Sequence, residues 1–281
     1  MLTNLSDETF EQFLLLASVQ NTINLGNITF IDPFGMVGVL ETGRYYKSMN
    51  AARNMVLPNS SHVLKYLERM DFFKHCRRFF SIQPETQAIS GRYLRKKFSD
   101  VLLEITPIEK SDDIHFIVSK VKKRAHNILS SHLHYDENRI NGFIVSLSEV
   151  CQNIIEHSEN TGFVGIQKYH FQKYKMNVVK IAVMDLGIGF SGSLSDRVSL
   201  IGDLEAIEMA LLQGVSRHSD EGRGHGLAAV RKFVQNWNGK ISIRSGTAKV
   251  SIIPSWSWGK SREQDLIHFP GAQINIMLPE V

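Results

Sequence analysis

The segment Ser146–Ser158, with the sequence SLSEVCQNIIEHS, carries the residues best suited to chemistry. At helical spacing, Glu149, Asn153 and His157 recur every fourth residue and share one polar stripe. An acid, an amide and an imidazole on one face can supply a proton acceptor, a neutral oxygen ligand for a hard cation, and a further polar contact to a bound ligand. The alternative is the solvated face of an amphipathic helix, because such faces carry similar stripes.

A second candidate site is an acid at the end of an apolar segment, followed by alternating glycines. Residues Met176–Asp185 have the composition of a strand, and Gly187 and Gly189 follow it. The Asp185 carboxylate can accept a hydrogen bond from an amino group such as that of adenine. The glycines let the backbone pass close to a flat ligand.

The same glycines, together with Gly192, also match the spacing of a dinucleotide-binding loop. That fold requires a helix that opens at the glycines and an acid at the end of the next strand. Residues 193–199 are polar and loop-like, and Glu205 and Glu208 fall inside a helical pattern at 204–212. The sequence therefore disfavours a dinucleotide-binding fold.

A third cluster, EGRGHGL at residues 221–227, precedes a helical pattern at 228–237. Glycines that lead into a helix start offer backbone N–H groups to phosphate, helped by the positive end of the helix dipole. No Gly-Lys-Ser/Thr sequence follows, so this is not a Walker loop. A glycine-rich loop without a ligand is the alternative.

The composition is that of a globular protein, with 43% hydrophobic and 21% charged residues among 281. A net charge of +4 and basic clusters without a recognisable binding module disfavour nucleic acid as a partner. Two cysteines, Cys76 and Cys151, are too few for a disulfide framework or a zinc site. Without a secretory signal or an apolar run long enough for a bilayer, we expect a cytoplasmic protein with no membrane anchor.

The elements that must position these residues alternate between helices and strands in the second half of the chain. The predicted elements are helices at 114–133 and 138–157, strands at 162–171 and 176–185, helices at 204–212 and 228–237, and closing strands at 239–245 and 273–279.

The first hundred residues show a strand–helix–strand–helix rhythm that is typical of an α/β sandwich. The predicted elements are a helix at 10–19, a strand at 27–32, a helix at 36–47, a strand at 54–57 and a serine-capped helix at 62–70. With the turn Asp32-Pro33-Phe34-Gly35, this region resembles the STAS domains of anti-sigma-factor antagonists. Those domains offer a serine as phosphoacceptor just before the glycine, where this chain has Phe34. The resemblance therefore implies a protein-interaction domain that is not switched by phosphorylation there; a purely structural subdomain is the alternative.

Three ordered motifs resemble the GHKL ATPase fold, the superfamily of histidine-kinase catalytic domains, anti-sigma-factor serine kinases, and gyrase-type and mismatch-repair ATPases. They are acid-x-x-x-Asn-x-x-x-His on a helix, Asp-x-Gly-x-Gly after a strand, and Gly-x-Gly-x-Gly-Leu before a helix, with a terminal strand that ends in Leu-Pro. The resemblance covers about residues 114–281 and is closest to the histidine-kinase and anti-sigma branch.

The resemblance implies that the ligands are ATP and Mg²⁺. Asn153 would ligate the magnesium ion, Asp185 would bind the adenine amino group, and Glu149 would be the catalytic base. Gly187 and Gly189 would shape the adenine pocket. The lid over the phosphates would comprise Gly222, Arg223, Gly224, His225, Gly226 and Leu227. His157 would be a contact whose role the resemblance does not define. A solvated lid is the alternative to phosphate contacts by Arg223 and His225.

Two features depart from the family pattern. Gly271-Ala272 replaces a common Gly-Thr pair, so a hydroxyl contact near the adenine acid would be lost. Residues 254–270 interrupt the closing sheet as a partner-binding loop or a folded excursion. No long dimerisation helix with a phosphoacceptor histidine precedes the ATPase motifs, which disfavours a self-phosphorylating sensor kinase.

We therefore expect an α/β protein with two domains: a STAS-like interaction domain at 1–105 and a two-layer α/β sandwich of GHKL (Bergerat) type at 106–281. The expected activity is that of an ATPase or a protein kinase that transfers the γ-phosphoryl group of ATP. The alternative is a non-catalytic, nucleotide-gated interaction module. The sequence names no protein partner and leaves the oligomeric state open, including a homodimer.

Overall fold

A seven-stranded sheet is the centre of the protein. The computed structural model describes residues 2–83, 100–158, 160–172, 174–215 and 226–281. The strands of this sheet are β6 (Val101–Ile108), β7 (Gly162–Phe171), β8 (Met176–Asp185), β9 (Lys240–Gly246), β10 (Ala248–Ile252), β11 (Arg262–Glu263) and β12 (Phe269–Pro279). Their order is β11-β10-β9-β12-β8-β7-β6, and all neighbours are antiparallel.

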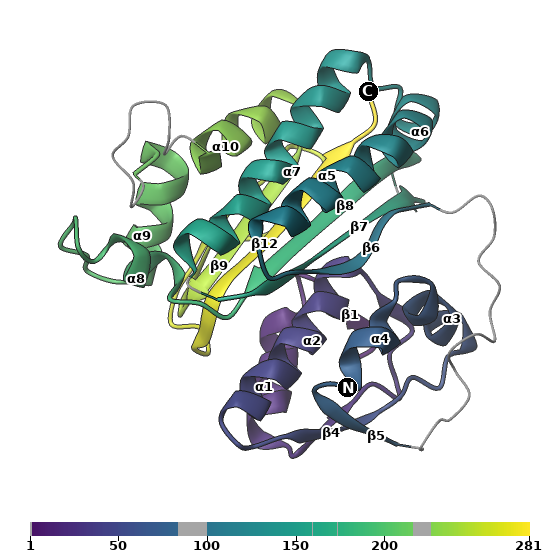
Figure 1. Ribbon diagram of the computed structural model, residues 1–281, viewed down its shortest axis with the longest axis vertical. Coiled ribbons are helices and arrows are strands. Elements are labelled where there is room, and N and C mark those ends of the chain that lie inside the picture. The colour runs from purple at the N-terminus through teal and green to yellow at the C-terminus, as the bar shows by residue number, and fades with distance from the viewer. Residues whose placement is uncertain (1, 84–99, 159, 173, 216–225) are drawn as a thin grey trace.

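Three long helices cover one face of this sheet (Figure 1): α5 (Ser111–Ala125), α7 (Glu137–His157) and α10 (Gly226–Asn236). The α7 helix begins after Asp136, whose side chain accepts a hydrogen bond from the backbone N–H of Arg139. Alternate strand residues such as Ile181 and Val183 are buried in the core under these helices. This half of the structure has the helix-on-sheet layers expected of the sandwich.

Shorter helical elements complete this half. They are a π-helical turn η1 (His126–Ser130), α6 (Ser131–Leu133), α8 (Gly189–Leu194), α9 (Asp203–Glu208) and a second π-helical turn η2 (Met209–Gln213). The helix α8 begins at Gly189 and includes Ser193 and Leu194, for which a loop was expected from the sequence; both residues are buried.

The N-terminal region (residues 2–83) packs around a second hydrophobic core, distinct from the one under α7. Its helices are α1 (Phe10–Val19), α2 (Pro33–Ser48), α3 (Ser61–Arg69) and α4 (Phe72–Cys76), and its strands are β1 (Asn4–Leu5), β2 (Thr22–Asn24), β3 (Phe30–Ile31), β4 (Arg53–Val56) and β5 (Phe80–Gln83). The strands β2, β4 and β5 form a parallel sheet in that order, and β1 and β3 form a separate parallel pair. The arrangement is α/β as predicted, whereas the specific STAS resemblance stays a prediction. Phe34 is buried and meets the Phe10 ring edge-on, with 5.3 Å between ring centroids.

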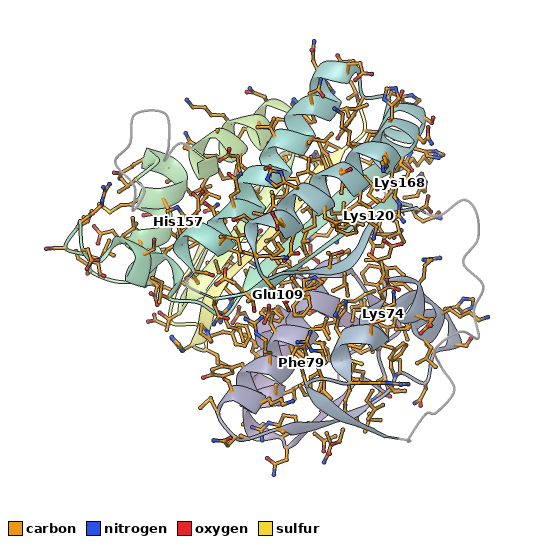
Figure 2. The ribbon with its side chains drawn as sticks, viewed as in Figure 1. Lys74, Phe79, Glu109, Lys120, His157 and Lys168 are labelled. Carbon is orange, nitrogen blue, oxygen red and sulfur yellow. The ribbon has the colours of Figure 1, made fainter. Side chains whose placement is uncertain are left out.

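The N-terminal region covers the second face of the large sheet (Figure 1). The sheet residues Phe163, Ala182, Met184 and Phe269 are buried in the same core as the N-terminal helices. Because side chains alternate between the two faces of a strand, Ala182 and Met184 point away from α7. Figure 2 shows Phe79 within the N-terminal region.

Buried ion pairs join the same two parts. Lys180 lies 2.8 Å from Asp32, which also caps α2 through the backbone N–H of Gly35. Lys249 lies 2.7 Å from Asp7. Arg244, only 2% exposed in its side chain, pairs with Glu11 at 2.5 Å. The charged residues of these strands therefore contact acidic residues of the N-terminal region instead of water.

Several predicted elements agree with the structure in their bounds, including α1, β7 and β8. The predicted domain boundary at residue 105 falls inside β6, which pairs with β7 of the large sheet. The sequence analysis missed β10 and β11, which flank and enter the segment 254–270. Among the described helices, none has both the length and the apolar character needed to cross a membrane.

Candidate functional site

A cleft of about 840 Å³, including the open space at its mouth, lies between α7, the sheet and the shorter helices. Predicted site residues from four segments line it: Glu149, Asn153, Asp185, Gly189, Gly226 and Leu227. His157 also lines it, while Val183 and Ile274 form part of an apolar floor suited to a flat ring.

Asp185 is at the end of β8, where the residue is buried and only 4% exposed. The backbone N–H of Gly187 donates a hydrogen bond of 2.7 Å to Oδ1, and the backbone N–H of Ala272 also donates to this carboxyl group. Burial raises the pKa of Asp185 to about 7, although these hydrogen bonds and Arg44 oppose the rise. Asp185 can therefore accept from an amino group when ionised, and it titrates near neutrality.

Glycines are needed around this acid because the backbone is crowded. A Cβ at Gly187 would overlap the carbonyl oxygen of Ser158. Gly189 and Gly271 have φ values of +67° and +77°, a region that strains other residues. Gly187 does not line the cleft; it packs behind the acid and hydrogen-bonds it.

Glu149 projects from α7 toward the start of α10. A Cβ at Gly226 would overlap Oε2 of Glu149, so the glycine allows α10 to begin against the carboxylate. Burial and repulsion from Glu156, two turns further along α7, raise the pKa of Glu149. A raised pKa suits a carboxylate that accepts a proton during a reaction.

Asn153 lies one turn after Glu149 on the same wall. Its buried Nδ2 has no hydrogen-bond partner among the described residues, which is unusual for a buried polar atom and fits a bound polar ligand. No group of three or more His, Cys, Asp or Glu in the described part of the chain could hold a metal by itself. Mg²⁺ commonly takes one or two protein oxygens and completes its shell with phosphates and water, so the Asn153 amide oxygen fits that role.

Figure 2 shows His157 at the end of α7 that lies toward α9. Its place on the cleft wall matches the predicted polar stripe. Gly222, Arg223, Gly224 and His225 lie outside the described residues. Gly226 and Leu227 line the cleft, and the lid over the phosphates stays a prediction.

Sequence reasoning missed Ser245 on β9. Its hydroxyl donates to the carbonyl oxygen of Gly271 at 2.7 Å and accepts from the backbone N–H of Phe190 at 3.2 Å. It thus fixes the two glycine-containing turns beside Asp185. At the position of the Gly-Thr pair, the backbone N–H of Ala272 contacts the acid. The signal available in the sequence was a serine at the end of a strand that borders the site.

The tryptophans of the segment 254–270 pack on the protein itself. Trp256 donates a 2.6 Å hydrogen bond to the carbonyl oxygen of Asn238, and its ring and that of Trp258 lie 6.4 and 6.0 Å from Tyr174. These contacts support the folded excursion, while Trp258 remains 56% exposed.

No curated protein shows a significant match to the chain. Residues 140–266 match the family described as histidine kinase-, DNA gyrase B-, and HSP90-like ATPase. This range includes Glu149, Asn153, Asp185 and the glycine cluster, and it ends before β12. Residues 140–266 are therefore identified as an ATPase domain of this histidine kinase-, DNA gyrase B-, and HSP90-like type.

Proposed function

We propose that this protein binds ATP with Mg²⁺ in the cleft and presents the γ-phosphoryl group to Glu149. One observation carries the proposal. The candidate adenine acid Asp185, the candidate metal ligand Asn153 and the candidate base Glu149 line a single cleft within the matched domain.

Each residue then has a role that its surroundings support. Asp185 accepts from the adenine amino group, and Asn153 holds Mg²⁺, which neutralises charge on the phosphates. Glu149 orients and deprotonates the attacking water or acceptor hydroxyl, and its raised pKa favours this role. The product is inorganic phosphate if water attacks, or a phosphorylated partner if a side chain attacks.

A nucleotide-gated interaction module is the second candidate function. It is favoured by the packing of α2 from the N-terminal region against β8, the strand that ends in Asp185. In that case nucleotide binding changes how the N-terminal region engages a protein partner, and no phosphoryl transfer is needed. Binding of a partner through the STAS-like region, a cytoplasmic location and a homodimer belong to the proposal in either form.

Phosphate release separates the two functions. Glu149→Gln should abolish release while ATP still binds. Glu137→Gln is the matched control, because Glu137 lies on the same helix, does not line the cleft and has a side chain that is 70% exposed. Equal loss in both variants would contradict a specific role for Glu149. ATP binding by the wild type without phosphate release, alone or with a partner, would favour the gated module.

A further inference from the structure

Arg44 connects the N-terminal region to the loop after α7. This arginine lies on α2, outside the matched ATPase residues. Its guanidinium donates to Oγ1 and to the carbonyl oxygen of Thr161, at 2.9 and 2.7 Å, and to Oδ1 of Asn160 at 3.1 Å. Three hydrogen bonds from one planar group fix both the position and the direction of this loop.

The loop in turn supports the backbone of the predicted adenine site. Asn160 Nδ2 donates to the carbonyl oxygen of Leu186 at 3.1 Å. The backbone N–H of Ile188 donates to the carbonyl oxygen of Ser158 at 3.1 Å. These bonds lie on either side of Gly187, whose N–H contacts Asp185. A displacement of the loop would therefore displace the turn that orients the acid.

Arg44 also acts on Asp185 through its charge. Its Nε lies 3.1 Å from Oε2 of Glu41, which is fully buried. Burial, together with repulsion from Asp185, raises the pKa of Glu41 to about 8. At neutral pH Glu41 is therefore mostly protonated and leaves the charge of Arg44 largely uncompensated. That positive charge lowers the pKa of Asp185 and favours its ionised form. Among the described residues, Arg44 and Glu41 are the charged groups that face Asp185 from α2.

We propose that Arg44 is a positioning residue for the adenine site, so that the N-terminal region completes a nucleotide site which the ATPase domain does not build alone. The inference rests on the proposed binding of ATP at Asp185. The coupling is reciprocal: if the docked N-terminal region increases the affinity for ATP by some factor, bound ATP stabilises the docked position of that region by the same factor. A partner that competes for α2 would then weaken nucleotide binding.

The test compares ATP affinity in the full chain with Arg44 replaced. Coupling between two such elements typically changes affinity by a factor of about 5 to 150, and Arg44→Ala should weaken ATP binding by about tenfold at pH 7. The pH at which ATP affinity reaches half of its maximum should also be higher in Arg44→Ala than in the wild type, because loss of the Arg44 charge raises the pKa of Asp185. Arg44→Lys, which keeps the charge, should restore the pH dependence. Arg53→Ala is the matched control, since Arg53 belongs to the N-terminal region but contacts Asn21 and Tyr46.

The outcomes separate this inference from the proposed function. A wild type that does not bind ATP overturns both. A folded Arg44→Ala protein with wild-type affinity and pH dependence overturns the inference alone. If Arg44→Ala does not fold, Thr161→Val removes one acceptor of the same arginine; a several-fold loss of ATP affinity supports the inference, and unchanged affinity overturns it.

Discussion

The affinity for ATP should fall as the pH is lowered through neutrality, because the adenine acid titrates there. Asp185 has a pKa of about 7 from burial. Only the ionised carboxylate is a pure acceptor for the adenine amino group. Between pH 8 and pH 6 the ionised fraction falls about tenfold, which corresponds to about 1.4 kcal/mol of binding free energy.

The phosphates of ATP also titrate in this range, so the assay needs a nucleotide with the same phosphates. Inosine triphosphate serves this purpose, because a carbonyl oxygen replaces the amino group of adenine. Calorimetric titrations at pH 6 and pH 8 should show that the preference for ATP over inosine triphosphate is large at pH 8 and about tenfold smaller at pH 6. In Asp185→Asn the preference should not depend on pH. An equal preference at the two pH values in the wild type would refute the role of Asp185.

Three further predictions concern the surrounding structure. Gly187→Ala introduces a methyl group that overlaps a backbone carbonyl oxygen, so it should cost about 1–3 kcal/mol in thermal unfolding and weaken ATP binding, whereas Gly202→Ala, at a site with open space, should do neither. Lys180→Met leaves the buried carboxylate of Asp32 unpaired and should cost about 3–5 kcal/mol in urea unfolding; adding Asp32→Asn should recover most of this loss. Because the folded-state pKa of Glu41 is about 8, above its ordinary value of 4.5, its contribution to stability is lost as the pH rises between these values. Between pH 5 and pH 9, the free energy of unfolding of Glu41→Gln should therefore rise by up to about 4 kcal/mol relative to that of the wild type. Curves of unfolding free energy against pH that run parallel for the two proteins would contradict this account.

The sequence was sufficient to predict those helices and strands that are defined by the residues of their own segment. The predicted bounds of β7 and β8 match the structure, and the stripe of Glu149, Asn153 and His157 lines one wall of the cleft. The two strands are recognisable as short segments rich in apolar and β-branched residues that are bounded by turn residues, and the helix is recognisable because burial on one face sets its period. The match of residues 140–266 to the ATPase family agrees with the order of motifs.

Contacts between distant segments could not be predicted in the same way. Lys180, Arg244 and Lys249 alternate with apolar residues on their strands, and this pattern alone is also typical of a sheet face in water. The structure shows that these residues meet Asp32, Glu11 and Asp7 across the sheet. No local rule links residues more than a hundred positions apart.

The same reason explains why the sequence pattern put a domain boundary at residue 105, inside β6. Strand β6 belongs to the large sheet because it pairs with β7, about sixty residues later in the chain. The roles of Arg44 and Ser245 beside the adenine acid likewise depend on segments far from Asp185 in the sequence.

The most direct test of the central claim is a calorimetric titration of the wild type and Asp185→Asn with ATP and GTP, with and without Mg²⁺. We predict that the wild type binds ATP in a magnesium-dependent manner and binds GTP at least about tenfold more weakly. The reason is that guanine has a carbonyl oxygen at the ring position where adenine has the amino group that donates to Asp185. Asp185→Asn should lose this preference while it remains folded. A wild type that binds neither nucleotide, or an Asp185→Asn protein that still prefers ATP, would contradict the account.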